Sequence, residues 1–192
     1  MASDPSGFFK RMWRRLRSPS ARYSVLTLLV IGGLAGFVAT SGTQVMVAVT
    51  GTDKFCGTTC HSMQWVAKEH QASFHGANAS GVKAGCHDCH IPHEYPNLLY
   101  VKAKKGIKDV IGEMRGVIDS EEKFKGNRTL MAELVWEEYR ADDSRNCRYC
   151  HKFTKEVVAK QNESAQPMHE QVLEGKATCI DCHQGVAHEP PS

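Results

Sequence analysis

The amino-acid sequence predicts a mainly α-helical chain, with one long apolar helix near the N-terminus and then a small domain of short helices and loops with almost no sheet. Three observations favour this fold class. Residues 23–52 contain no Asp, Glu, Lys, Arg or His. The eight cysteines fall in four close pairs, and a histidine directly follows each pair. The roughly 140 residues after the apolar segment are few for a conventional hydrophobic core.

The apolar segment is long enough to cross a membrane. Its most apolar part, residues 23–43, has about 20 residues, and a helix of that length spans a hydrocarbon core of about 30 Å. Residues 1–22 hold six basic residues against one acidic residue, and the positive-inside rule therefore places the N-terminus in the cytoplasm. A basic tail also suits nucleic acid, but the apolar segment behind it favours a lipid bilayer, and no nucleic-acid partner is expected.

A cleaved signal peptide is the alternative to a permanent anchor, because it has the same basic-then-apolar order. Its apolar region would have only about 7–15 residues, with small residues at a cleavage site. The segment here is longer and ends without a convincing A-x-A site. We therefore expect a single-pass anchor in a bacterial inner membrane, with residues 44–192 in the periplasm.

The cysteine pairs have the spacing of haem attachment sites. Three read C-x-x-C-H, at residues 86–90, 147–151 and 179–183, and the first, at 56–61, has one extra residue between its cysteines. Two thiols add across the vinyl groups of one haem, and the adjacent histidine binds the iron. Structural zinc and disulfides also use paired cysteines, but neither requires a histidine after every pair. We expect four covalent haems c, attached by Cys56, Cys60, Cys86, Cys89, Cys147, Cys150, Cys179 and Cys182, with His61, His90, His151 and His183 as axial ligands.

Six further histidines are candidates for the second axial position. His87 lies inside its own attachment loop and cannot easily reach another iron. His75 and His169 lie away from the attachment loops, on segments expected to form short helices, and are the favoured ligands. We expect the others to be surface or packing residues; these are His70, His93 and His188.

With about 35 residues per haem, the cofactors themselves must form the core of the periplasmic domain. Two dihaem halves are expected, at about 50–97 and 120–192, joined by segment 98–118. This segment alternates apolar residues with lysines, which is typical of an amphipathic helix at a membrane surface. Packing against haem edges with a solvated lysine face is the alternative. Residues 128–140 predict a second helix.

Several short motifs carry a family resemblance: CHSM at 60–63, SFHGANASGV at 73–82, CHDCHIPHE at 86–94, GVID at 116–119 and CIDCHQGVAH at 179–188. With the basic N-terminus and single anchor, they resemble the NapC/NirT (NrfH-like) family of membrane-anchored tetrahaem cytochromes c, over nearly the whole chain. The resemblance implies quinol dehydrogenase activity: quinol is oxidised at the membrane surface beside the first haem, and electrons pass along the haems to a periplasmic oxidoreductase in anaerobic respiration or the nitrogen cycle.

The resemblance also implies particular ligands. Met63 corresponds to an unusual axial ligand of the first haem, with His61 as the alternative. His75 corresponds to the second ligand of the fourth haem, and His169 to that of the third. The extra residue between Cys56 and Cys60 departs from the family's usual C-x-x-C-H spacing.

The resemblance assigns Lys102 and Asp109 to the quinone site, and places Asp109 close to the iron of the second haem. Oxidising a quinol releases two electrons and two protons, so the site needs a proton acceptor. Asp109 would accept the proton, and Lys102 would hydrogen-bond the quinone oxygen.

Three other functions remain open at this point. Electrons could run the opposite way, from a periplasmic oxidoreductase such as hydroxylamine oxidoreductase into ubiquinone. The chain could be a tethered electron carrier without a quinone site. A terminal reductase is disfavoured, because it would need an open haem position in a larger catalytic domain. Assembly into a homo- or hetero-oligomer fits a small anchored protein of this kind.

Overall fold

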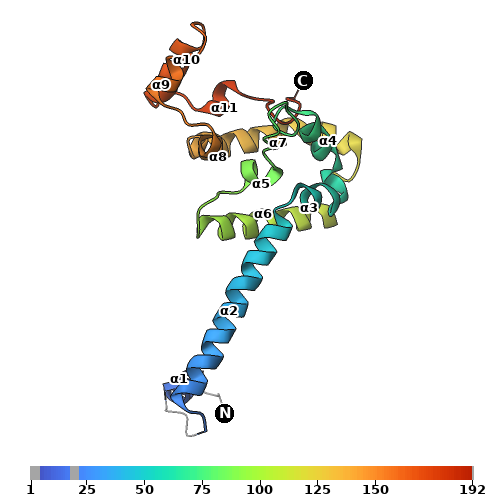
Figure 1. Cartoon of the computed structure of the whole chain (residues 1–192). Coiled ribbons are helices and arrows are strands. Elements are labelled where there is room, and N and C mark those ends of the chain that lie inside the picture. The colour runs from blue at the N-terminus through green and yellow to red at the C-terminus, as the bar shows by residue number, and fades with distance from the viewer. Residues whose placement is uncertain (1–4, 18–21, 192) are drawn as a thin grey trace. The chain divides into compact units, whose positions relative to one another are not determined.

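The described chain is built from helices and loops. A computed structural model describes residues 5–17 and 22–191, and no strand occurs within those ranges (Figure 1). The predicted mainly α-helical class is therefore confirmed. The chain divides into two compact units, Met1–Val47 and Ala48–Ser192.

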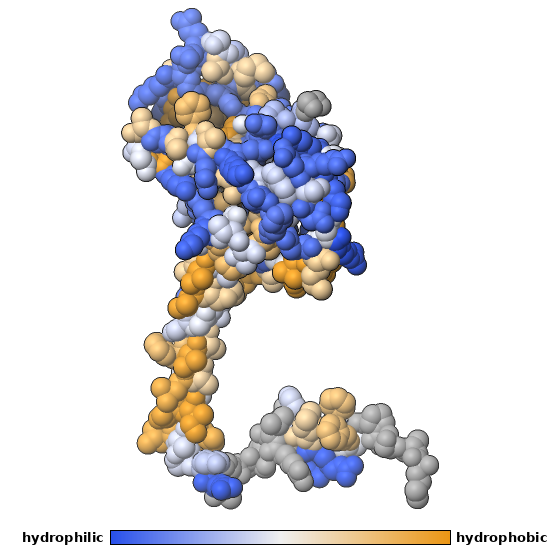
Figure 2. Space-filling model, turned by 90° about the vertical axis from the view of Figure 1, so that its right-hand side faces the viewer, coloured by the Kyte–Doolittle hydropathy of each residue, from blue (hydrophilic) through white to orange (hydrophobic). Residues whose placement is uncertain are grey.

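Helix α2 is the long apolar helix that the sequence predicts. It runs Val25–Thr50, so it continues seven residues beyond residue 43, and its 26 residues correspond to a length of about 39 Å. None of its residues is buried, and Figure 2 shows it as a column of mostly hydrophobic residues. Among the described residues, it is the one helix long and apolar enough to cross a membrane.

The basic N-terminal segment also contains a helix, α1, at Pro5–Arg17. The large apolar side chains of Phe8, Phe9 and Met12 are exposed. Because a helix has 3.6 residues per turn, these positions share one side of α1, and Lys10 and Arg11 lie outside that arc. The segment is therefore amphipathic as well as basic.

The second unit consists of short helices joined by loops, with α6 and α7 the longest at 18 and 21 residues. Each haem motif begins on a short helix or helical turn. The elements, in order, are α3 (Asp53–Thr58), η1 (His61–Met63), α4 (Gln64–Ala72), α5 (Cys86–His90), α6 (Asn97–Met114), α7 (Glu121–Ala141), α8 (Arg145–Cys150), α9 (Lys155–Val158), α10 (Gln166–Leu173) and α11 (Cys179–Cys182).

Side-chain caps explain several of these boundaries. The Ser120 hydroxyl accepts a hydrogen bond from the Lys123 amide at 3.3 Å, so α7 begins seven residues before the predicted start at 128. Such a cap satisfies one of the amide groups that the first helical turn leaves unpaired. In α11, the Asp181 carboxylate accepts a bond from the Thr178 amide at 2.7 Å and thereby fixes the start of the fourth motif.

Few apolar side chains are buried in the second unit. Those below about a tenth exposure, among the described residues, are Ile91, Leu98, Phe124, Val158 and Ile180. A side-chain core of this size is small for a domain of this length. The observation agrees with the expectation that bound haems occupy the interior.

Candidate functional site

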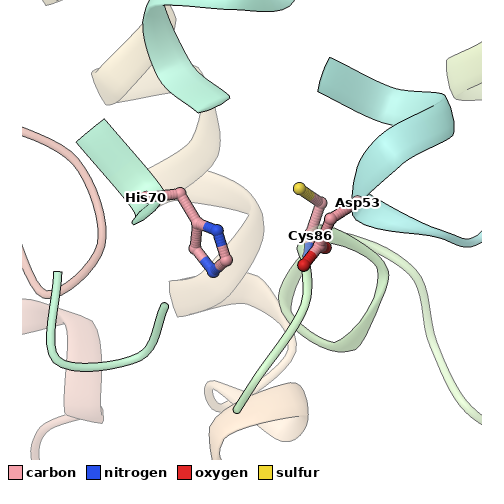
Figure 3. A group of neighbouring side chains, drawn as sticks. All are labelled: Asp53, His70 and Cys86. Atoms are coloured by element: carbon pink, nitrogen blue, oxygen red, sulfur yellow. The ribbon is translucent and has the colours of Figure 1, made fainter. Parts of the chain in front are cut away.

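The first and second haem motifs are joined through Asp53. Its carboxylate accepts a hydrogen bond from the Cys86 amide at 2.7 Å and pairs with Lys83 at 2.8 Å. Figure 3 shows Asp53 and Cys86 beside the buried ring of His70, and their ligand-type atoms lie within 4.8 Å of one another. However, haem attachment uses the Cys86 sulfur, and His70 Nε2 donates to the Ala84 carbonyl at 2.7 Å. The hydrogen bond from Cys86 to Asp53 therefore connects the first two motifs. His70 is buried and bonded to the protein backbone, which is the environment of a packing residue.

Hydrogen bonds also join the later motifs in sequence order. The Asn146 amide group donates to the Cys89 carbonyl at 2.6 Å, and the Tyr139 hydroxyl donates to the same oxygen. The Ile180 amide donates to the buried hydroxyl of Ser144 at 3.3 Å. Because α5 packs against both α3 and α8, the motifs follow one another in space as they do in the sequence.

The pKa values of the cysteine thiols are shifted by thiols of neighbouring motifs, in the same order. The Cys86 hydrogen bond lowers the pKa of Cys56 to about 7. Burial, together with the thiols of Cys179 and Cys89, raises the pKa of Cys147 to about 11. All eight cysteines are free, so the disulfide alternative does not describe this structure.

Three motif histidines each face a second histidine that lies outside their own motif. A metal–imidazole bond is about 2 Å long and the ring centre lies about 1 Å beyond the nitrogen, so two imidazoles on opposite sides of one iron have centroids roughly 6 Å apart. The observed centroid separations match that value. They are 6.2 Å for His90 and His188, 6.2 Å for His151 and His75, and 6.0 Å for His183 and His169. The donor groups present therefore fit haem irons.

The pairing differs from the one that the family resemblance implied. The ring of His75 lies beside His151 of the third motif and that of His169 beside His183 of the fourth, whereas the resemblance assigned them to the fourth and third haems. The haem that each of them binds stays a prediction. His169 lies on α10, and the short connection from α10 to α11 returns the chain directly to the fourth motif. His75 lies in a turn after α4 rather than on a short helix, and its Nδ1 is 3.2 Å from the Val186 carbonyl.

His188 was expected to be a surface or packing residue, but it faces His90. An ion pair between Arg128 and Glu69 holds it there, with both side chains mostly buried. Arg128 donates to the Glu189 carbonyl at 2.7 Å, while the Glu189 amide donates to Glu69 at 3.2 Å. No local pattern marks His188, because this clamp joins three segments that are far apart in the sequence.

His93 has a different environment. Its ring stacks flat on Tyr149, with centroids 3.6 Å apart, and lies 5.8 Å from His87. In the His87–His93 pair, neither histidine directly follows a cysteine pair. The expectation of a packing role fits His93 in this arrangement.

The first motif has different neighbours from the other three. The ring next to His61 is Trp65, at 5.8 Å, and Gln64 Nε2 lies 3.1 Å from His61 Nε2. Trp65 in turn stacks on the buried ring of Phe124. Met63 ends the η1 turn, two residues after His61.

Glu113 of α6 binds the first motif, a contact that the sequence did not indicate. The His61 amide donates to its carboxylate at 3.1 Å, and the Ser62 amide donates at 3.3 Å. The Ser62 hydroxyl donates to the same carboxylate. Since 52 residues separate His61 from Glu113 in the chain, only the tertiary fold shows this contact.

Lys102 and Asp109 also lie on α6 beside the first motif. Partial burial lowers the pKa of Lys102, and the nearby Cys56 thiol opposes that shift. Asp109 keeps an exposed surface, but the protein atoms around it raise its pKa, against the effect of Lys108 and Lys105. Both charges also act on Cys56, which brings the two predicted quinone-site residues together at one haem motif.

The surroundings of Asp109 include the first motif. It lies one turn from Glu113 on α6, and Glu113 binds the η1 turn. The ring that faces His90 in the second motif belongs to His188. The resemblance placed Asp109 close to the iron of the second haem, and that placement stays a prediction.

The other side of α6 is an exposed apolar stripe. Its side chains are between 43% and 83% exposed, and they are Tyr100, Ile107, Val110, Ile111 and Met114. At 3.6 residues per turn, this stripe lies well away from the face that carries Lys102, Asp109 and Glu113. Segment 98–118 is thus amphipathic as predicted, with its apolar side turned outward.

An apolar helix of membrane-spanning length, followed by four haem attachment motifs of which three pair two histidine rings, defines a membrane-anchored multihaem cytochrome c. Residues 18–192 match the NapC/NirT cytochrome c family, N-terminal region. The chain belongs to that family and carries covalently bound haem c. Members of the family oxidise membrane quinol and pass the electrons to periplasmic reductases.

Two relatives in sequence agree with this assignment, and one solved structure was also found. The cytochrome c-type protein NapC of Escherichia coli (strain K12) is 39% identical over 186 residues, which cover 96% of this chain and 92% of NapC. A protein named putative tetraheme cytochrome-c type from Allochromatium vinosum is 39% identical, covering 94% and 97%. The crystal structure of the cytochrome c nitrite reductase NrfHA complex, bound to the HQNO inhibitor, contains a chain with 25% identity and a TM-score of 0.49, covering 83% of this chain and 88% of that one.

Proposed function

We propose that this protein is a quinol dehydrogenase. It oxidises quinol between the first haem motif and the face of α6 that carries Lys102 and Asp109, and it passes the electrons through four haems c to a periplasmic reductase. One observation carries the proposal. Glu113 of α6 accepts the amides of His61 and Ser62, so the helix that carries Lys102 and Asp109 is bound to the first motif, whereas the second, third and fourth motifs each pair two histidine rings.

The charges on α6 suit the chemistry of quinol oxidation. A quinol yields a quinone, two electrons and two protons, and a bound haem takes one electron at a time. Asp109 accepts a proton from the quinol hydroxyl, and its raised pKa brings it closer to the working pH, as general-base catalysis requires. Lys102 donates a hydrogen bond to the same oxygen and stabilises negative charge as the proton leaves.

The remaining motifs suit conduction. We assign His188, His75 and His169 as the second ligands of the second, third and fourth haems, from the ring separations. An iron with two imidazoles has no position left for a substrate, so these haems only exchange electrons. His61 and Met63 are the assigned candidates at the first iron.

The membrane supplies the substrate. Cys56 lies six residues after Thr50, the last residue of α2, so the first motif stands close to where the chain leaves the bilayer. The exposed apolar stripe of α6, with Lys104 and Lys108 on the same helix, has the composition of a helix at the lipid–water interface. We place the N-terminus in the cytoplasm and the haem domain in the periplasm.

The test uses the full-length holoprotein in lipid nanodiscs, mixed anaerobically with a quinol while haem reduction is followed by absorbance. Lys102→Gln should slow quinol-dependent reduction about 10²-fold, because it removes the donor to the quinone oxygen. Lys104→Gln, two residues along on the exposed side, is the matched control and should leave the rate unchanged. Equal rates in all three proteins would make the chain a tethered electron carrier instead.

The direction of flow follows from potentials, since a catalyst accelerates both directions. We expect spectroelectrochemical titration to place the haem potentials above that of the resident quinol, so that oxidation is downhill. Haem potentials below that of the quinone would instead make quinone reduction the favoured direction. Purification in mild detergent should retain the periplasmic partner and identify it.

A further inference from the structure

The start of the η1 turn lacks a cap from its own segment. The first amides of a helix have no partner within the helix and are usually capped by a nearby Ser, Thr, Asp or Asn. Here the cap position is Cys60, which makes no side-chain cap bond and whose sulfur is needed for haem attachment. The first motif therefore cannot cap itself.

Glu113 supplies that cap from α6. Its two carboxylate oxygens accept the amides of His61 and Ser62, at 3.1 Å and 3.3 Å, and the hydroxyl of Ser62. Ser62 is buried, at 5% exposure, so its donors have little access to water. A negative charge at this position also complements the partial positive charge of the helix start.

Glu113 lies on the same face of α6 as Lys102 and Asp109. At 3.6 residues per turn, Lys102, Asp109 and Glu113 lie within about 40° of one another around α6. A bond from this face to the amides beside His61 and Met63 therefore sets the separation between the axial ligands of the first haem and the groups that handle the quinol oxygen and proton.

We propose that Glu113 is a positioning residue that ties the ligand turn of the first haem to the helix carrying Lys102 and Asp109. This inference rests on the proposed function, because it assigns the quinol site to those two groups. The tie itself is independent of the direction of electron flow.

The test compares the Glu113→Gln and Glu113→Ala holoproteins with Glu137→Gln, a matched control at an exposed glutamate of α7. We expect amide hydrogen exchange at residues 61–63 to rise about tenfold in Glu113→Gln, and further in Glu113→Ala, because charged hydrogen bonds to the amides are lost. The electron paramagnetic resonance signal of the first haem should change, while those of the other three stay as in the wild type.

A double-mutant cycle with Ser62→Ala gives a second readout. Since the Ser62 hydroxyl donates to Glu113, the effects of Ser62→Ala and Glu113→Gln on exchange should be less than additive. Additive effects, or an unchanged first-haem signal with four haems still bound, would overturn the inference. A wild-type protein that fails to oxidise quinol would instead overturn the proposed function, and the exchange measurements would be unaffected.

A different observation concerns α1. Phe8, Phe9, Met12 and Trp13 are exposed by 63%, 64%, 41% and 57%, and their spacing places them on one side of the helix. Lys10, Arg11 and Arg14 occupy the rest of the circumference and are also exposed. In Figure 2 the hydrophobic and hydrophilic residues of this helix lie on opposite sides.

We infer that α1 lies in the headgroup region of the cytoplasmic leaflet and binds anionic phospholipid. Charge complementarity favours this occupant, because basic side chains beside an apolar face suit an anionic lipid surface. The chain supplies the second argument: Arg17 ends α1 eight residues before Val25 begins the membrane helix α2, so the helix is tethered at that surface.

Lipid quenching of Trp13 tests the inference. The full-length holoprotein is reconstituted in phosphatidylcholine vesicles containing brominated lipid, with or without phosphatidylglycerol, and the Trp13→Phe variant isolates the signal of Trp13. We expect about twofold stronger quenching with phosphatidylglycerol, lost in 1 M salt as screening predicts. Trp136→Phe, in the periplasmic unit, is the control and should keep the lipid dependence. Quenching that is absent, or equal in both lipids, would overturn the inference.

Discussion

The first haem motif and the other three share one attachment chemistry but differ in what surrounds them. In the second, third and fourth motifs a histidine ring faces another histidine ring at about the separation that one shared metal ion requires. The histidine of the first motif instead faces Trp65, and the charges of Lys102, Asp109 and Glu113 gather around its turn.

Under the proposed function, this difference divides the work of the chain between quinol oxidation and electron conduction. Axial ligands and the groups around them are the levers by which a protein sets what a haem does. A haem iron with two imidazole ligands has no open position and can only exchange electrons, which suits a haem that passes electrons along the chain. A proton acceptor and a hydrogen-bond donor beside the first motif suit a site that must also move protons.

Replacing Asp109 should cause the largest loss in the rate of quinol-dependent haem reduction. Asp109→Asn removes the proton acceptor and should lower quinol-dependent haem reduction about 10²- to 10⁴-fold. Reduction by dithionite, which needs no proton acceptor, should be unchanged, and Asp119→Asn beyond the end of α6 serves as the control. If the Asp109 variant still oxidises quinol at the wild-type rate, the base lies elsewhere.

The histidine pairs can be broken next. His188→Ala should leave the second haem with one imidazole and convert its signal from low-spin to high-spin, with about tenfold slower electron exit because the axial ligand sets the potential. His93→Ala is the matched control, since His93 stacks on Tyr149. A high-spin signal in the His93 variant and none in the His188 variant would reverse the assignment.

The pH dependence of quinol oxidation should follow Asp109. Protein atoms around this carboxyl raise its pKa above 3.8, and it accepts a proton only when it is deprotonated. The rate should therefore be highest above that pKa and fall about tenfold per pH unit below it. Stopped-flow rates across pH should show this acid limb in the wild type, and its persistence in Asp109→Asn would assign the limb to another group.

The apolar stripe of α6 should give the smallest effect. Ile107→Asn and Met114→Gln weaken contact with the lipid surface and should raise the KM for quinol about threefold, with kcat little changed, because capture of quinol rather than proton transfer is impaired. Steady-state kinetics in nanodiscs would measure this. A lower kcat at unchanged KM would place the stripe against protein instead of lipid.

Local sequence was sufficient for the covalent chemistry. The spacing of each cysteine pair and its histidine is a short-range pattern, so the haem attachment residues could be read directly, as could the apolar anchor from its lack of charge. Segment 98–118 was recognised as amphipathic because helical periodicity is also local. The approximate place of Lys102 and Asp109 came from the family resemblance, and the fold brought both to the first motif.

Contacts between distant segments had to wait for the tertiary structure. Each ring pair joins residues at least 14 positions apart, and the His90–His188 pair depends on the clamp between Glu69 and Arg128. The sequence by itself predicted where the haems attach and which segment is long and apolar enough to cross a membrane. Only the fold decided which histidines face each other and that Glu113 caps the first motif, because those contacts depend on how separate helices pack and leave no periodic trace in the chain.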